Sequence, residues 1–218
     1  MLKRLPVLAL ALAGCTFGPG NIQTRHSTDI QARKVRRIAV VTPETAQPAQ
    51  KPKVPFTSGR EAKNSEREIS ETLARQLYAA MAAAPGWQIV AESEVREVAG
   101  TVSTEGEAAR LRRIGEMVFA DAVLVGRVQR YRERVGDEWG AKSPASVAFV
   151  LELIDVRRGD IVWSARFDET QKPLSENIFA LGEISQRGVR WLSAEQLLHE
   201  GVKKAVGQLH QLLVRTRA

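Results

Sequence analysis

The sequence predicts an α+β domain, with a mixed sheet of about five strands, a long antiparallel hairpin portion and three main helices packed on it. Two observations lead to this fold class. In the first half, short apolar runs alternate with helical periodicity, in the order strand, helix, strand, helix, strand. In the second half, apolar and polar residues alternate over long stretches before a last helical run. The 218 residues, 44% of them hydrophobic, are enough to bury one sizeable core.

In the first half, turn and cap residues delimit the expected elements. Pro43 stops the first apolar run, and Ser65 with Glu68 forms the pattern of a capping box before a long periodic segment that ends at Pro85. In chain order we expect a buried strand over 36–43, a core-facing helix over 65–84, a short strand over 87–91, a helical turn over 93–98, an amphipathic helix over 108–118 and a strand over 120–135.

In the second half, two alternating strands over 147–153 and 161–167 are joined by a tight turn at 156–160. Their outward residues are polar and charged, which is typical of a sheet with one wet face. Ser193 is a plausible N-cap for a carboxyl-terminal helix, and Glu195 in its first turn suits the helix dipole.

The amino terminus has the layout of a secretory signal. Lys3 and Arg4 precede an apolar run over 5–13 that is too short for a permanent membrane span. The run ends in Leu-Ala-Gly directly before Cys15, the chain's one cysteine, and this stretch resembles the lipobox of bacterial lipoproteins. We therefore expect residues 1–14 to be a signal peptide; the alternative is an ordinary signal followed by a cysteine.

The lipobox resemblance implies cleavage before Cys15, a diacylglycerol on its sulfur and a third acyl chain, such as palmitate, on the new amino terminus. Two or more acyl chains anchor a protein stably to a membrane. Thr16 stands where an aspartate often means retention at the inner membrane, so the resemblance implies the outer membrane, with the domain facing the periplasm.

The rest of the chain divides into a tether and one domain. Residues 15–35 carry the lipidated cysteine and, from their polar composition, a flexible tether. Residues 36–218 are expected to form a single α+β periplasmic domain. Within it, residues 44–64 are rich in proline and predict a mobile loop, either a contact surface or a solvated loop.

Three segments resemble a recurring α/β domain of bacterial envelope proteins, over 37–41, over 120–126 and over 153–164, the last with Asp155, Gly159 and Asp160. The family includes the curli secretion channel lipoprotein, the lipoprotein activators of penicillin-binding proteins and the amino-terminal domain of the Tol translocation protein. The resemblance implies a non-enzymatic domain that binds another envelope component. The stretch over 44–64 departs from the family pattern.

The sequence contains no recognisable catalytic, metal or cofactor motif. One cysteine and three histidines offer no metal-binding spacing, and phosphate loops and the Gly-x-Ser-x-Gly nucleophile motif are absent. Asp168 and Glu169 are adjacent on an expected strand, so they point to opposite faces and do not form a carboxylate pair. The net charge of +7 permits a polyanionic partner, but a secretory signal argues against nucleic acid.

Two groups of residues are candidates for an interaction surface. Three arginines with a spacing of two share one face of the expected strand over 120–135, and a polar segment follows the last strand. Arginine and tryptophan are frequent anchors of binding surfaces, whereas solvated strand ends and a tryptophan packed on the last helix are the structural alternatives. The candidates are Arg130, Arg132, Arg134, Asp168, Glu169, Gln171, Arg190 and Trp191.

Together these observations predict a lipid-anchored, non-enzymatic accessory or interaction protein at the periplasmic face of the outer membrane. Its partners are expected to be the membrane, through Cys15, and an unidentified envelope protein. One alternative is a subunit of an oligomeric outer-membrane secretion channel; an envelope hydrolase is less consistent with the missing catalytic motif. The sequence leaves the oligomeric state open.

Overall fold

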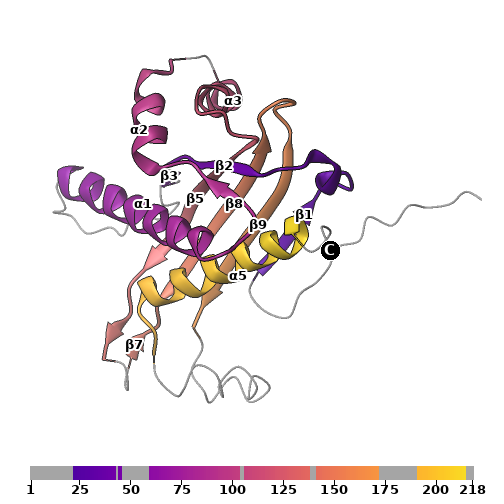
Figure 1. Ribbon diagram of the computed structural model, residues 1–218. Coiled ribbons are helices and arrows are strands. Elements are labelled where there is room, and N and C mark those ends of the chain that lie inside the picture. The colour runs from indigo at the N-terminus through magenta and orange to yellow at the C-terminus, as the bar shows by residue number, and fades with distance from the viewer. Residues whose placement is uncertain are drawn as a thin grey trace, which may run out of the picture.

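The structure, a computed structural model, describes residues 22–42, 44–45, 59–103, 106–137, 141–171 and 191–214 (Figure 1). Its main sheet has the strand order β1-β9-β8-β5-β2-β4, with β3 paired on β5, and β6 and β7 form a separate small hairpin. The strands are β1 (Ile22–His26), β2 (Arg37–Val40), β3 (Glu44–Thr45), β4 (Gln88–Ile89), β5 (Ala122–Arg132), β6 (Val135–Gly136), β7 (Ala141–Ser143), β8 (Ser146–Asp155) and β9 (Ile161–Thr170).

The sheet is mixed, as predicted. Strands β2, β3, β4 and β5 pair in parallel, whereas β5, β8, β9 and β1 pair antiparallel. The predicted α+β class is therefore confirmed. The helical elements are η1 (Ile30–Arg33), α1 (Gly59–Ala82), α2 (Glu92–Thr101), α3 (Glu107–Met117) and α5 (Ala194–Val214).

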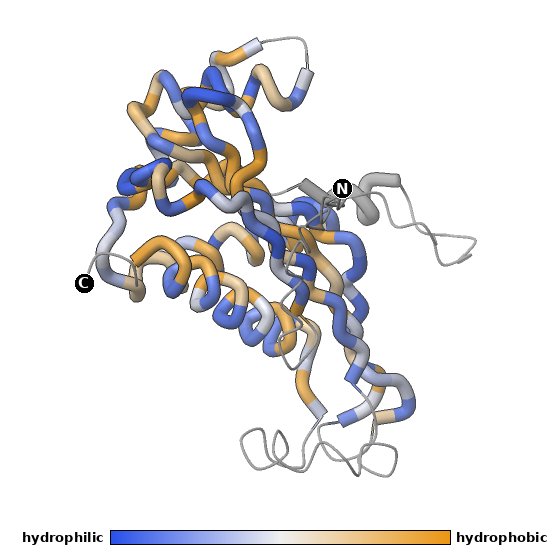
Figure 2. Tube along the Cα trace, turned by 90° about the vertical axis from the view of Figure 1, so that its right-hand side faces the viewer, coloured by the Kyte–Doolittle hydropathy of each residue, from blue (hydrophilic) through white to orange (hydrophobic). Residues whose placement is uncertain are grey.

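Alternating side chains divide the core into two clusters, one on each face of the sheet. Leu124, Phe149 and Trp163 pack with α1 and α5 on one face, whereas Val123 and Ile154 pack with α2 and α3 on the other. Figure 1 shows α1 and α5 side by side across the sheet and α2 and α3 at its upper end. In Figure 2, hydrophobic positions gather where helices and sheet meet.

The expected flexible tether over 15–35 is wrong over most of its described part. Residues Ile22–His26 form β1, which pairs with β9 at the edge of the sheet, and η1 follows it. Ile22 and Ile30 are buried in the core. The strand was missed because it alternates only weakly and is held largely by backbone hydrogen bonds. Cys15, the signal peptide and residues 16–21 lie outside the described residues.

The predicted loop over 44–64 is also shorter than expected. Residues 44–45 form β3, and α1 begins at Gly59, so positions 65 and 68 lie inside the helix and not at its start. Residues 46–58 lie outside the part of the chain that the structure describes. The second predicted cap is confirmed, because the Ser193 hydroxyl accepts a hydrogen bond from the Gln196 N–H at 3.2 Å, and the Gln196 side chain accepts one from the Ser193 N–H at 2.8 Å.

A β-bulge in β5 decides where its arginines point. Val128 pairs with Phe149, but Arg130 pairs with the next residue of β8, Ala148, so Gln129 is an extra residue. The bulge reverses the alternation: Val128 before it and Tyr131 after it both pack on the helix-covered core. Arg130 and Arg132 consequently lie on the opposite face. The strand ends at Arg132 and not at residue 135 as predicted.

Candidate functional site

The surface that stands out is the part of the sheet that no described helix covers. Helices α2 and α3 pack only at one end of this face, while β5, β8, β9 and β1 continue beyond them. Cross-strand partners run from Gln23 through Arg166 and Val150 to Arg127, so these residues share the face. We call its basic residues the arginine face: Arg25, Arg127, Arg130, Arg132 and Arg166.

Carboxylates lie between these arginines and hold several of them in place. Arg127 donates from Nη1 to Glu152 at 2.6 Å and also pairs with Glu107 at the start of α3. Asp168 accepts from Arg130 on one side and from Arg166, at 3.4 Å, on the other. The guanidinium groups are thus oriented along the sheet while they remain partly accessible to solvent.

Hydroxyl groups extend this network toward the end of the strands. Arg130 Nε donates to the Ser146 hydroxyl at 2.6 Å, and that hydroxyl lies 2.6 Å from the Thr170 hydroxyl. Ser146 is buried beneath the arginine stems. Arg25 and Arg132 are exposed at two sides of the same face. The arrangement presents planar, fixed donors, which suit carboxylate or phosphate groups better than flexible lysines do.

Several predicted interaction residues instead join the sheet to α5. Arg134 follows the end of β5 and donates to the backbone carbonyl of Trp191. The Gln171 side-chain oxygen accepts a hydrogen bond from the Leu192 N–H at 2.8 Å. Trp191 is half-buried at this junction. These three residues are therefore part of a structural connection, and Arg190 lies outside the described residues.

A carboxylate that the sequence did not single out completes the junction. Both Glu133 carboxylate oxygens accept from the Ala194 N–H, at 3.2 and 3.1 Å, at the beginning of α5. A negative charge at a helix N-terminus is favourable because it interacts with the helix dipole. The end of β5 thus fixes the start of α5.

Asp168 and Glu169 diverge, as expected from their adjacency on a strand. Asp168 lies on the arginine face, and Glu169 is buried on the other side of the sheet. They do not form the pair of carboxylates that acid–base hydrolysis requires.

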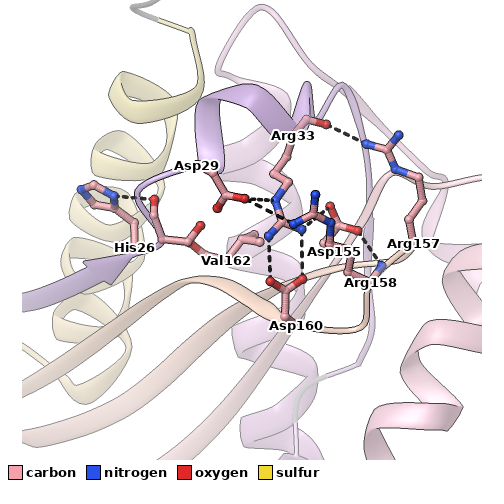
Figure 3. Close-up of polar contacts among 9 residues, drawn as sticks. His26, Asp29, Arg33, Asp155, Arg157, Arg158, Asp160 and Val162 are labelled. Atoms are coloured by element: carbon pink, nitrogen blue, oxygen red, sulfur yellow. Dashed lines mark hydrogen bonds and ion pairs between the residues drawn. The ribbon is translucent and has the colours of Figure 1, made fainter.

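A second cluster, which the sequence analysis did not find, surrounds Arg33 (Figure 3). The Arg33 side chain is only 6% exposed. Its guanidinium contacts three carboxylates: Asp29 at 2.9 Å, Asp155 at 3.3 Å and Asp160 at 2.8 Å. Arg157 adds a hydrogen bond of 3.1 Å to the Arg33 backbone carbonyl. The cluster ties the segment after β1 to the turn between β8 and β9.

Electrostatic shifts in the Arg33 cluster reflect this pairing. Hydrogen bonds from Arg33 lower the pKa of Asp29 and of Asp160, and hydrogen bonds to those carboxylates raise the pKa of Arg33. The pairing thereby favours the ionised forms of Asp29, Asp160 and Arg33. The contacts join η1 to the turn between β8 and β9.

Asp121 and Asp155, which lie in the segments that resemble the envelope-protein domain, also hold the backbone in place. The Asp121 carboxylate accepts from the backbone N–H groups of Arg36 and Arg37, both at 2.9 Å. Asp155 accepts from the Arg158 N–H at 2.9 Å, and Gly159 has a φ of +74° that glycine tolerates best. The motifs therefore fix strand starts and a turn, in keeping with their expected structural character.

Two further properties bear on function. Among the described residues, no group of three or more His, Cys, Asp or Glu side chains is placed to hold a metal ion. Within the same part of the chain, no helix combines the length and apolar character needed to cross a membrane.

No family model matches the chain, and no curated protein matches it. Solved structures are similar to the chain at low identity. The chain is similar to the PelC dodecamer from Paraburkholderia phytofirmans, at 18% identity over 87% of this chain and 97% of that one, with a TM-score of 0.44. Lipoprotein GNA1162 from Neisseria meningitidis follows, at 18% identity over 69% and 95%, with a TM-score of 0.39. The C-terminal domain of LpoB from Escherichia coli is similar at 14% identity over 62% and 83%, with a TM-score of 0.34.

Proposed function

We propose that the chain is a lipid-anchored, non-enzymatic accessory protein of the bacterial outer membrane, which faces the periplasm and binds another envelope protein through the arginine face. The observation that carries this proposal is a sheet covered by helices on one face and only at one end of the other. On the uncovered part, β1, β5 and β9 display arginines held by carboxylates. The partner is expected to present acidic side chains that replace Asp168 or Glu107 on those arginines.

Site-specific photocrosslinking in intact cells tests the binding surface. A photoreactive amino acid at Gln23, which is exposed on the arginine face, should crosslink to one envelope protein. The same group at Arg75, which is exposed on α1, is the matched control and should give no such product. Equal crosslinking at the two positions would argue against the arginine face as the binding surface.

Charge reversal examines the chemistry of the contact. Arg25→Glu with Arg166→Glu should remove the crosslink from Gln23, because an acidic partner would then face like charges. Arg67→Glu with Arg75→Glu changes the net charge equally on α1 and should leave the crosslink intact. A crosslink that survives the first pair of substitutions would exclude an acidic partner.

The lipid anchor needs its own test, because Cys15 lies outside the described residues. Metabolic labelling with a fatty acid should mark the wild-type chain, and Cys15→Ser should abolish the label and let the uncleaved precursor accumulate. Label retained in the Cys15→Ser chain would contradict the anchor.

The native particle size separates the accessory protein from the oligomeric secretion channel. Membranes are extracted with mild detergent, and the particle is sized with its crosslinked partner. A discrete assembly of many copies of this chain would support the channel subunit and overturn the accessory role.

A further inference from the structure

Phe119, at the junction of α3 and β5, combines an unfavourable backbone conformation with an exposed side chain. Its φ is +53°, and its side chain is 84% exposed. The Phe119 N–H donates to the Glu116 carbonyl at 3.2 Å, and the Ala120 N–H to the Gly115 carbonyl at 2.9 Å. This is the Schellman arrangement that ends many helices, and Phe119 occupies the position that is usually glycine.

Neither the backbone nor the core explains a phenylalanine at this position. A left-handed conformation is unfavourable for a residue with a bulky side chain, and glycine would adopt it without steric cost. An exposed ring contributes little packing to the fold. Strained residues that the fold does not need are frequently found at functional surfaces.

The surroundings of Phe119 combine a second apolar side chain with a rim of arginines and carboxylates. Met117, two residues earlier, is 41% exposed. Arg37 Nε donates to the Val118 carbonyl at 3.3 Å, so the start of β2 lies beside the residue that precedes Phe119. Arg37 pairs with Glu94, and Arg112 and Arg113 of α3 pair with Glu116. Arg36 and Arg37 also donate their backbone N–H groups to Asp121, so four arginines and three carboxylates lie on the elements that meet at this corner.

An aromatic ring and a methionine with an arginine rim match the chemistry of an anionic membrane surface. Aromatic side chains insert at the boundary between headgroups and acyl chains, while basic residues interact with lipid phosphates. Long arginine side chains keep their charge in the headgroup layer.

The length of chain between Cys15 and the sheet keeps the domain near such a surface. The seven steps from Cys15 to Ile22 span at most about 25 Å. Ile22 pairs with Phe167, and the six steps along β9 from Phe167 to Ile161 cover roughly 20 Å. Ile22 is at the end of β1 that lies away from Phe119, so Cys15 reaches the level of Ile161 when residues 15–22 run back along the sheet close to their full extension.

We propose that Phe119 and Met117 insert into the anionic membrane surface to which the chain is anchored, with the surrounding arginines on the lipid phosphates. This inference rests on the proposed lipid anchor for the nearness of the membrane. It sets the orientation of the domain, because the α3–β5 corner points to the membrane and the arginine face stays accessible from the side.

The test uses the chain from residue 15 to residue 218 with Cys15→Ser, so that acyl chains do not dominate binding. Wild-type chain should sediment with vesicles of 70% phosphatidylcholine and 30% phosphatidylglycerol, and less with pure phosphatidylcholine. Phe119→Gly should raise the unfolding temperature by about 2–4 °C, because strain is relieved. The same variant should weaken binding to the anionic vesicles about tenfold or more, because the buried ring is lost.

Val135→Ser is the matched control, since Val135 is another exposed apolar residue. It lies in β6, which pairs with β7, and Figure 1 shows β7 at the end of the molecule opposite α3. The substitution should leave vesicle binding unchanged. Phe119→Asn, which also tolerates the left-handed conformation, gives a second variant if the glycine variant folds poorly.

The proposal would be overturned if the wild-type chain did not bind anionic vesicles, or if the Phe119→Gly chain bound them as tightly as the wild type. It would also be overturned if the Phe119→Gly chain had a lower unfolding temperature than the wild type. Fatty-acid labelling in cells reports on the anchor separately. A chain that lacks the label but binds vesicles through Phe119 would contradict the anchor and support the membrane contact.

Discussion

Arg33 donates from Nη1 and Nη2 to the two carboxylate oxygens of Asp160, at 3.1 and 2.8 Å. This bidentate pair joins residues that are 127 positions apart in the sequence. It connects the segment after β1 to the turn between β8 and β9, and Asp155 approaches the same guanidinium from within the protein (Figure 3). The contact holds the segment that follows the edge strand β1 against the turn between β8 and β9.

Removing Arg33 is expected to destabilise the domain. In Arg33→Met, the Asp155 side chain, which is 2% exposed, loses its cation and remains as a buried carboxylate. Breaking one side of a buried pair is strongly unfavourable, so the unfolding temperature should fall by roughly 5–10 °C. Arg25→Met, in the exposed part of β1, is the control and should change it little. Equal changes in the unfolding temperature for the two substitutions would show that the Arg33 cluster does not stabilise the fold more than an exposed arginine does.

The same cluster predicts an acid limit to stability. Arg33 lowers the pKa of Asp29 and Asp160 below the ordinary value of 3.8. A lowered pKa in the folded state gives stability that is present above the unfolded value and is lost as the pH falls through the folded one. The urea midpoint should therefore decline below about pH 4. The decline should be smaller in Arg33→Met, and an identical decline would contradict this origin.

The elements that the sequence predicted are those with strong internal periodicity. The helix over 108–118 and the carboxyl-terminal helix repeat apolar residues at helical spacing, and α3 and α5 occupy these segments. Strand β1 lacks such a signal, because only Ile22 of its five residues is buried. Its pairing depends on β9, which lies far along the chain.

The candidate surface was predictable only in part. Alternation placed Arg130 and Arg132 on one face opposite Tyr131, and this relation holds in the structure. The bulge at Gln129 brings Arg130 and Arg132 onto the same face as Arg127. The alternating pattern of the sequence gives no sign of this extra residue. Arg33 was assigned to the tether because its carboxylate partners at the β8–β9 turn are distant in sequence.

The chain's two tyrosines should resist deprotonation at a pH where tyrosine usually ionises. Burial raises the pKa of Tyr131 to about 12, with a contribution from Glu133, and burial raises the pKa of Tyr78 further. The Tyr78 hydroxyl also donates to the Val40 carbonyl at 3.0 Å. Absorbance at 295 nm should stay flat through about pH 10 in the folded protein and rise there in denaturant. A rise at that pH in the folded chain would place a tyrosine in solvent.

The ion pairs of the arginine face should matter little for stability. Arg166 and Asp168 are 52% and 41% exposed, and exposed pairs contribute little because water and salt screen them. Arg166→Gln and Asp168→Asn should each change the free energy of unfolding by less than about 1 kcal/mol. Urea denaturation checks this. A larger loss would mean that these charges serve the fold, and the crosslinking result would then need variants of equal stability.

Gly201 in α5 should be sensitive to the addition of a single methyl group. A Cβ there would lie 2.8 Å from both Phe149 and Phe167, whose rings stack with centroids 5.2 Å apart beneath the helix. The helix would have to move away from the sheet, so Gly201→Ala should cost about 1–3 kcal/mol. Gly207, in the same helix, has nothing within 4 Å of the added atom. Gly207→Ala should therefore stabilise the protein by about 0.5–1 kcal/mol through helix propensity. Urea unfolding of the two variants compares them directly, and equal effects would contradict close packing of α5 on the aromatic pair.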